Sequence, residues 1–186
     1  MRYAGFWPRL GAGLVDLLVW VPFIIVASWS MSASRDIALL LQVPMTLLFA
    51  FYSIYFVGRW GRTIGKMALG IKVVGLDGTE AGFRRAFCRH SVDLGFSVIM
   101  TAITIFSLLS IPAAEYNALG FEDKMIRLNE ATPWWSGVTD VLYWAWIGSE
   151  LIVLLLNEKR RALHDFIAGT VVIHTERPAV QASSPS

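Results

Sequence analysis

The chain has 186 residues, of which 55% are hydrophobic and only 16% are charged. A soluble domain of this size carries about 25% charged residues, so the apolar excess indicates lipid-facing surface rather than a large core. The net charge of +2 says little by itself, because its distribution along the chain decides what it attracts. The single cysteine, Cys88, excludes an intramolecular disulfide and reads as a small residue at a helix start.

The first apolar run extends from about Leu10 to Trp29, and about 20 helical residues are enough to cross a bilayer. Arg2 and Arg9 resemble the charged start of a signal peptide. The run is too long for such a peptide, however, and it contains Asp16. We therefore predict a retained first span.

Asp16 is the most informative residue of this run. A carboxylate inside a spanning helix costs about 2.5–3.5 kcal/mol, so it normally faces a partner, a cavity or an ion pathway. Arg9, Ala12, Gly13 and Trp20 recur at helical spacing and share its face. This polar stripe fits two roles: a structural clamp, or the binding of a proton or cation by Asp16.

Three further apolar runs, at about residues 37–57, 94–114 and 138–156, have the length of one crossing each. Because lipid offers no hydrogen-bond partners, each run must be helical. Prolines within or at the ends of the runs predict bends rather than breaks. The sequence thus predicts an all-α integral membrane protein, a bundle of four transmembrane helices.

Basic residues are concentrated in the connection 58–93 and after the fourth run. They are Arg59, Arg62, Lys66, Lys72, Arg84, Arg85 and Arg89, followed by Lys159, Arg160, Arg161 and Arg177. The connection 115–137 is acidic instead. By the positive-inside rule, both termini and loop 58–93 are predicted to be cytoplasmic. We expect this loop to attract anionic lipid headgroups rather than nucleic acid.

Two short β-branched segments interrupt the helical pattern. Residues 70–78 read as a strand followed by an Asp-Gly turn, and residues 169–174 as a second strand. Neither strand is stable alone, so we predict a cytoplasmic two-stranded element. From Glu176 the composition of Pro, Ala, Gln and Ser predicts a disordered tail, which leaves residues 1–175 as the membrane domain.

Further polar residues mark the third and fourth spans. Glu150 lies roughly 9 Å from the cytoplasmic end of its helix, as does Asp16 in the first span. Two carboxylates in one low-dielectric layer cannot both ionise freely, so they would share a proton or a cation. Hydroxyls on one face of the third span either line a wet path or bond their own helix backbone. These are Ser97, Thr101, Thr104 and Ser107, with weaker hints from Gln42 and Thr46 in the second span.

Chemistry typical of soluble enzymes is not indicated. Residues 61–66 approach a phosphate-binding loop, but the spacing is wrong and Met67 replaces the required Ser or Thr. His90, His164 and His174 form no metal-ligand pattern. We therefore expect no enzyme activity, no metal and no cofactor.

Three motifs resemble the signatures of the RDD family of bacterial membrane proteins, which is named for one arginine and two aspartates. They are FWPRLGAGLVD at 6–16, GRTIGKMALGIKVV at 61–74 with Asp77-Gly78, and RRALHDFIAGTVV at 160–172. The resemblance implies the bacterial cytoplasmic membrane, and it makes Arg9, Asp16 and Asp165 the signature residues. Families of this kind most often have three spans, and the additional length here lies around the acidic connection. The resemblance therefore implies nothing about the role of that connection. Sodium/proton antiport is reported for some members.

Two functions remain open at this point. In the first, the protein is a small proton- or sodium-coupled transporter, acting as a homodimer, in which Asp16 binds the ion and Glu150 assists. Ser97, Thr101 and Thr104 would line the access path. In the second, it is a non-transporting scaffold or accessory protein that recruits lipid or a protein partner. We also predict that Arg9 lies within salt-bridge distance of Asp165 or Asp16, because an arginine that faces a bundle interior needs a carboxylate to offset its desolvation. An Arg9–Asp165 pair would lock the C-terminal segment under the bundle.

Overall fold

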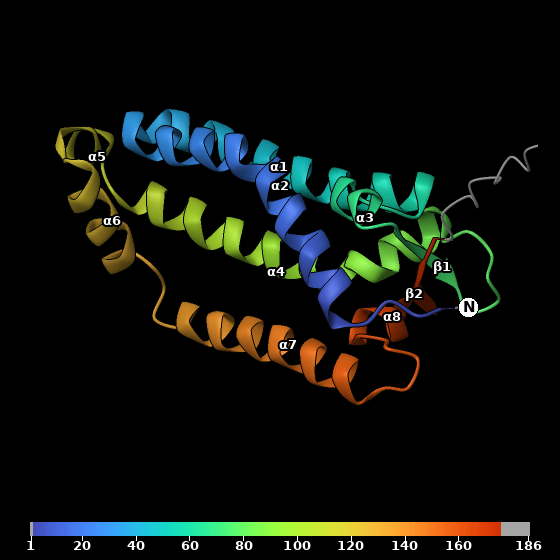
Figure 1. Cartoon of the computed structure of the whole chain (residues 1–186). Helices are drawn as coiled ribbons and strands as arrows, with labels where there is room; N and C mark the ends of the chain where they lie inside the picture. The colour runs from blue at the N-terminus through green and yellow to red at the C-terminus, as the bar shows by residue number, and fades with distance from the viewer. Residues whose placement is uncertain (1, 176–186) are drawn as a thin grey trace, which may run out of the picture.

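A computed structural model describes residues 2–175, which form eight helices and two strands (Figure 1). The long helices are α1 (Phe6–Ala33), α2 (Arg35–Trp60), α4 (Gly82–Ser110) and α7 (Ser136–Leu156). The short ones are α3 (Ile64–Ala68), α5 (Ala113–Ala118), α6 (Phe121–Glu130) and α8 (Leu163–Ala168). The strands are β1 (Ile71–Gly75) and β2 (Thr170–His174). The tail expected to be disordered, 176–186, lies outside the described residues.

The four long helices run alongside one another and carry most of their apolar side chains on the outside. Leu18 is 69% exposed, Leu40 70% and Leu142 55%. All four are long and apolar enough to cross a membrane. Such exposed apolar surface is favourable in lipid and unfavourable in water. The chain is therefore an all-α membrane protein with a small two-stranded sheet, and the predicted fold class is confirmed.

Helix packing is uneven around the bundle. α2 packs most extensively on α4, and α1 lies against α2 and α3. α7 makes fewer contacts with α4, and Figure 1 shows it standing apart from the other three long helices. Midway along α7, the Trp146 indole N–H donates to Asp93 of α4 at 3.0 Å, and Tyr143 packs on Phe96.

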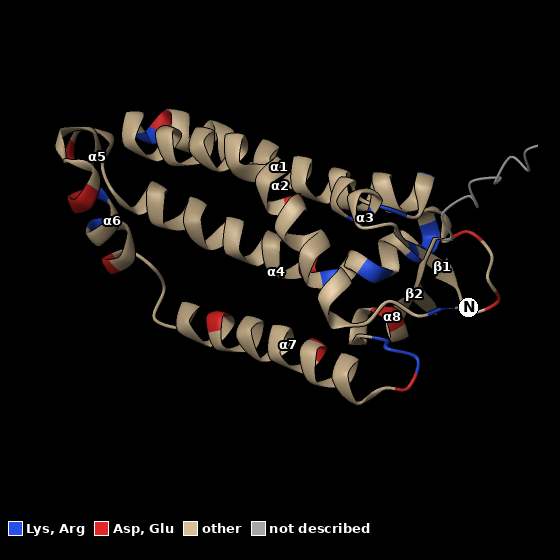
Figure 2. Cartoon of the chain, in the orientation of Figure 1, with Lys and Arg blue, Asp and Glu red and all other residues tan. Residues whose placement is uncertain are grey.

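Charged residues gather at the two ends of the bundle (Figure 2). We call the end that holds α3, β1, β2 and α8 the sheet end, and the opposite one the α5–α6 end. Most blue Lys and Arg positions in Figure 2 lie at the sheet end. The mid-sections of the long helices are almost free of charge in the same view, as a hydrocarbon layer requires.

The connection expected between residues 58 and 93 is shorter than predicted, because both flanking helices extend into it. α2 continues to Trp60, and α4 already begins at Gly82 rather than near residue 94. The first turns of α4 contain several arginines, which end a hydropathy signal but do not break a helix. α4 also ends at Ser110, before Pro112, instead of at residue 114.

The acidic connection 115–137 contains two helices that the sequence analysis did not anticipate, α5 and α6. Lys124 of α6 is buried, donates to the Ser32 carbonyl at 2.6 Å and lies over the ring of Tyr116. The Tyr116 hydroxyl donates to the Met31 carbonyl at 2.7 Å. These donors satisfy carbonyls in the last turn of α1, which no residue of that helix can reach. The connection thus closes one end of α1.

The two predicted strands pair antiparallel, in a register from Ile71 opposite His174 to Gly75 opposite Thr170. Tyr3 forms an isolated bridge to Ile173, so the N-terminal segment joins the same element. Val73 and Val172 are fully buried in the adjoining core. The sheet therefore draws the segment after α7 back beneath α1, and this placement builds the site described next.

Candidate polar site at the sheet end

Asp16 is held by three hydrogen-bond donors from α2 and the start of α3. The hydroxyls of Tyr52 and Thr63 each lie 2.6 Å from its carboxylate, and the backbone N–H of Gly65 donates at 2.7 Å. These three contacts occupy most of the acceptor sites of the carboxylate, of which there are about four. Asp16 therefore fastens the α2–α3 connection to α1.

Gly65 is required at this contact because α1 and α3 approach very closely. A Cβ atom at this position would lie 1.9 Å from the carbonyl oxygen of Ala12. Only glycine, which lacks a side chain, permits backbones to come this near. The close approach delivers the Gly65 N–H to Asp16.

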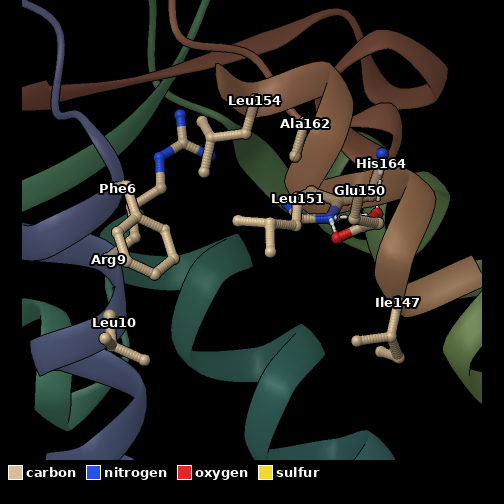
Figure 3. Close-up of a pocket in the computed structure, with 9 residues that line it drawn as sticks. All are labelled: Phe6, Arg9, Leu10, Ile147, Glu150, Leu151, Leu154, Ala162 and His164. Atoms are coloured by element: carbon tan, nitrogen blue, oxygen red, sulfur yellow. Dashed lines mark hydrogen bonds and ion pairs between the residues drawn. The ribbon is translucent and has the colours of Figure 1, made fainter. Parts of the chain in front are cut away.

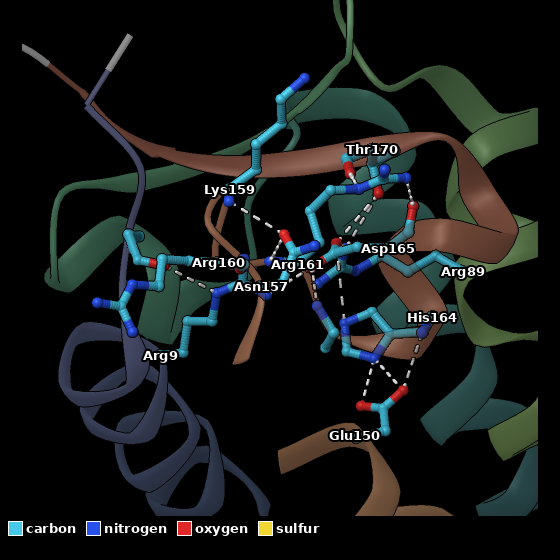
Figure 4. A network of polar contacts seen from close by, with 12 residues as sticks. Arg9, Arg89, Glu150, Asn157, Lys159, Arg160, Arg161, His164, Asp165 and Thr170 are labelled. Atoms are coloured by element: carbon cyan, nitrogen blue, oxygen red, sulfur yellow. Dashed lines mark hydrogen bonds and ion pairs between the residues drawn. The ribbon is translucent and has the colours of Figure 1, made fainter. Parts of the chain in front are cut away.

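Asp165 lies at the centre of a larger network and is completely buried (Figure 4). Arg9 donates to its Oδ2 at 2.6 Å, and Arg89 forms an ion pair with its Oδ1. The Thr170 hydroxyl and the Ala162 N–H donate at 3.1 Å each. The ion pair expected between Arg9 and Asp165 is therefore present, within a network that also includes α4 and β2.

Arg9 uses all three of its side-chain nitrogens within the protein. Besides Asp165, it donates to the Arg160 carbonyl at 2.6 Å and to the Ala4 carbonyl at 3.2 Å. The planar guanidinium suits such fixed multiple contacts. Arg9 consequently ties the N-terminal segment to the connection that follows α7.

Arg89 is the residue of this network that sequence reasoning missed. It is 4% exposed, and it also donates to the Thr170 hydroxyl at 3.2 Å. The sequence analysis assigns it, with six other basic residues, to the cytoplasmic loop 58–93. A continuous helical reading from Gly82 would have placed it on the inner face of α4, and that was the available signal.

Glu150 forms a pair with His164 rather than with Asp16. The His164 N–H donates to Glu150 Oε1 at 3.0 Å, and its ring Nδ1 contacts both carboxylate oxygens (Figure 4). Burial, reinforced by the positive charges of Arg89 and Arg9, lowers the pKa of His164 well below its usual range. This lowered pKa favours the neutral form of the ring.

The charge on Glu150, when it is ionised, contributes to the charge balance of this group of side chains. Two guanidinium groups, of Arg9 and Arg89, then face two carboxylates, of Asp165 and Glu150. Protonation of Glu150 removes one of these negative charges, and Asp93 of α4, which accepts from Trp146 of α7 at 3.0 Å, is a further carboxylate near Arg89 and Glu150. Buried charges are tolerated when they are paired, so the charge on Glu150 matters to its neighbours as well as to itself.

A cavity of about 240 Å³ adjoins the Glu150–His164 pair (Figure 3). Figure 3 shows it between α1, which contributes Phe6, Arg9 and Leu10, and the sheet end of α7. Concave sites with a few polar groups in an apolar wall are typical binding sites for small molecules. This cavity is the place where an outside molecule could reach the network.

The remaining predicted site residues lie elsewhere. In α4, Ser97, Thr104 and Ser107 donate to carbonyls four residues earlier in the helix, at 2.8–3.0 Å. Thr101 instead pairs with Thr46 of α2 at 2.6 Å. Three of the four hydroxyls thus make the backbone contacts that the sequence analysis gave as the alternative to a wet path. Within residues 2–175, no group of three His, Cys, Asp or Glu side chains could hold a metal ion.

The fold and this network define an all-α membrane protein whose N- and C-terminal segments are locked together by buried arginine–aspartate pairs. The model of the RDD family matches residues 3–169, and the chain belongs to that family. It is also similar to the uncharacterized protein YckC of Bacillus subtilis (strain 168), with 26% identity over 173 residues. That alignment covers 92% of this chain and 84% of YckC. No solved structure matches the chain.

Proposed function

We propose that this protein is a small cation/proton exchanger of the bacterial cytoplasmic membrane, with Glu150 as the group that exchanges ions. The observation that carries this proposal is the Glu150–His164 pair in the wall of a cavity. A carboxylate that is partly accessible and paired with a neutral imidazole can gain and lose a proton without dismantling the fold.

The exchange follows from the charge balance. One carboxylate provides one negative charge, so a proton and a monovalent cation compete for Glu150. Either ligand leaves the same total charge on the cluster that also contains Arg9, Arg89 and Asp165. The exchange is therefore one proton for one cation and is electroneutral.

His164 can support both states of Glu150. When Glu150 is ionised, the imidazole donates from Nδ1. When Glu150 is protonated, the carboxylic acid donates to Nδ1, and the imidazole proton moves to Nε2, which lies 3.9 Å from Asp165 Oδ1. A change of tautomer thus accompanies proton uptake, and the ring remains uncharged.

Orientation is part of the proposal. Both termini and the sheet end lie in the cytoplasm, because basic residues gather there, and the four long helices each cross the bilayer. A homodimer would give the four helices of one chain a surface against which to move. Anionic lipid headgroups would lie against exposed residues of the sheet end, Arg59, Arg84 and Lys159.

Asp16 has an anchoring role in this proposal instead of the ion-binding role that the sequence suggested. Its carboxylate already accepts from Tyr52, Thr63 and Gly65. Displacing these donors with a cation would release α3 from α1. Glu150, in contrast, receives its hydrogen bonds from a single residue among those described.

The test is proton flux in vesicles that contain the purified protein and a trapped pH-sensitive dye. A sodium jump should produce proton movement that continues when the membrane potential is clamped to zero. Glu150→Gln should abolish it. Asp140→Asn, which changes an exposed carboxylate on the same helix, should leave it unchanged. Flux that persists in Glu150→Gln would refute the assignment of this residue.

A second function, a non-transporting scaffold or accessory protein, is favoured by a different observation. All three signature residues, Arg9, Asp16 and Asp165, are used in contacts that hold segments together. Under this alternative, wild-type vesicles show no flux with sodium, potassium or proton gradients. Asp16→Asn and Asp165→Asn then lower only the yield of folded protein.

A further inference from the structure

The cavity beside Glu150 has the size and the apolar lining of a site for an organic molecule. Its volume of about 240 Å³ is just below the range of about 300–1,000 Å³ that is typical of sites for drug-sized molecules. Six of the nine residues that line it are apolar, among them Phe6, Leu10 and Leu151. A hydrated sodium ion gains nothing from such a wall, whereas an organic molecule gains by burying carbon.

The cavity opens sideways between two long helices. The side chains of Leu10 on α1 and of Ile147 and Leu151 on α7 line it and remain about 40% exposed. Figure 3 shows these residues on facing helices with Glu150 on the α7 side. In a membrane this mouth faces lipid near the sheet end. A molecule dissolved in the bilayer can therefore reach Glu150 without passing through water.

Charge decides which kind of molecule fits. Arg9 lines the cavity, but its positive charge is already paired with Asp165, and three of its five N–H groups donate to Asp165, Arg160 and Ala4. The carboxylate of Glu150 accepts from His164 and retains lone pairs, because an ionised carboxylate has about four acceptor sites. Glu150 is therefore the charged group of the cavity that can pair with an entering cation, because the positive charge of Arg9 is directed at Asp165.

We propose that the cavity binds a lipophilic organic monocation, such as an ammonium that carries one apolar group and enters from the bilayer. The ammonium lies against Glu150, and the apolar group packs between α1 and α7. This inference rests on the proposed function in one respect: the same carboxylate exchanges its proton. The cation that replaces that proton is then an organic one.

The experiment measures binding and does not require transport. Benzyltrimethylammonium is added to the full-length protein in detergent, and saturation-transfer NMR reports its contacts. Neopentylbenzene, the neutral molecule of the same shape, and benzenesulfonate serve as comparison compounds. The protein variants are Glu150→Gln, Asp140→Asn as the matched control and Leu151→Trp, which fills the cavity from a partly exposed position.

Benzyltrimethylammonium should bind the wild type and Asp140→Asn equally, about tenfold more weakly to Glu150→Gln, and not detectably to Leu151→Trp. Equal binding to wild type and Glu150→Gln would overturn the proposal. So would tighter binding of benzenesulfonate, which would make the cavity an anion site served by Arg9. If Glu150→Gln loses sodium-driven flux but the protein does not bind the ammonium, the proposed exchange function stands and the proposal of an organic cation is refuted. If the ammonium binds in a manner that depends on Glu150 but no flux is measured, the binding site stands and the exchange function is refuted.

Discussion

Asp165 and Glu150 belong to one polar network, yet their surroundings differ in every respect that matters for function. Asp165 is 0% exposed, and its carboxylate accepts hydrogen bonds from four residues, two of them arginines. Glu150 is 18% exposed at its side chain, is paired with His164 and borders a cavity. A fully enclosed carboxylate cannot exchange its ligands without local unfolding. A carboxylate beside a cavity can exchange its ligands while the fold stays intact.

The contrast indicates that the charged residues of this bundle have two roles, one structural and one exchangeable. The arginine–aspartate pairs link the N-terminal segment, α4 and the segment after α7, and they form the fixed part. α7 makes fewer contacts with the other long helices than they make with one another, and it carries the acid that remains accessible. Four variants test this division, beginning with the fixed part.

Asp165→Asn should have the largest effect on stability. The variant leaves the guanidinium groups of Arg9 and Arg89 buried without their counter-ion, which costs about 3–5 kcal/mol. The midpoint of thermal unfolding in detergent should fall steeply, or folded protein should not be recovered. Asp140→Asn is the control, because Asp140 is exposed on α7. Equal midpoints for the two variants would show that Asp165 does not hold the segments together.

Gly65→Ala should have the second largest effect, because its methyl group would collide with the Ala12 carbonyl at 1.9 Å. Forcing extra volume into a close backbone contact costs about 1–3 kcal/mol. Gly95→Ala in α4 is the matched control, since a Cβ there meets nothing within 4 Å and alanine favours a helix. The two variants should therefore shift the unfolding midpoint in opposite directions.

Glu150→Gln should change stability less than either of these variants, although it should abolish flux. The amide keeps the shape of the side chain and can still accept from the His164 N–H, so about 1 kcal/mol is expected. Circular dichroism melts of the variant and wild type would measure the shift. A loss as large as that of Asp165→Asn would place Glu150 in the fixed part and contradict the division drawn above.

The sequence predicted the parts of this architecture that depend on local composition. The four long apolar helices were found because a stretch of about 20 apolar residues is a local property. The strands at Ile71–Gly75 and Thr170–His174 pair as expected, since two isolated β-branched segments have few other partners. Their pairing also brought Arg9 within reach of Asp165.

Contacts between segments that are far apart in the sequence could not be predicted from local composition. Arg89 meets Asp165 across 76 residues, and its place on the inner face of α4 depends on where that helix begins. The sequence predicts Glu150 in the same layer as Asp16, but Glu150 pairs with His164 of α8. α1 also begins at Phe6 and not near Leu10, so Asp16 lies further from the start of its helix than expected. The helices α5 and α6 were missed because their mixture of acidic and apolar residues resembles a loop.

Lys66 provides the smallest and most specific prediction, a pH dependence of stability. This lysine of α3 lies outside the spanning helices, and burial, reinforced by the positive charge of Arg89, lowers its pKa from 10.5 to about 7. Between these two values the unfolded chain binds more protons than the folded protein, so the free energy of unfolding rises with pH across that window. Below pH 7 and above pH 10.5 this contribution is constant.

Unfolding midpoints measured from pH 6 to pH 10 should therefore show an upward slope that Lys66→Met removes. Lys159→Met, at an exposed position, should keep the slope and serves as the control. Because Arg89 faces both Lys66 and Asp165, the slope also reports how well Asp165 neutralises that guanidinium. A slope that survives in Lys66→Met would mean that Lys66 is solvated and that the positive charge of Arg89 does not reach α3.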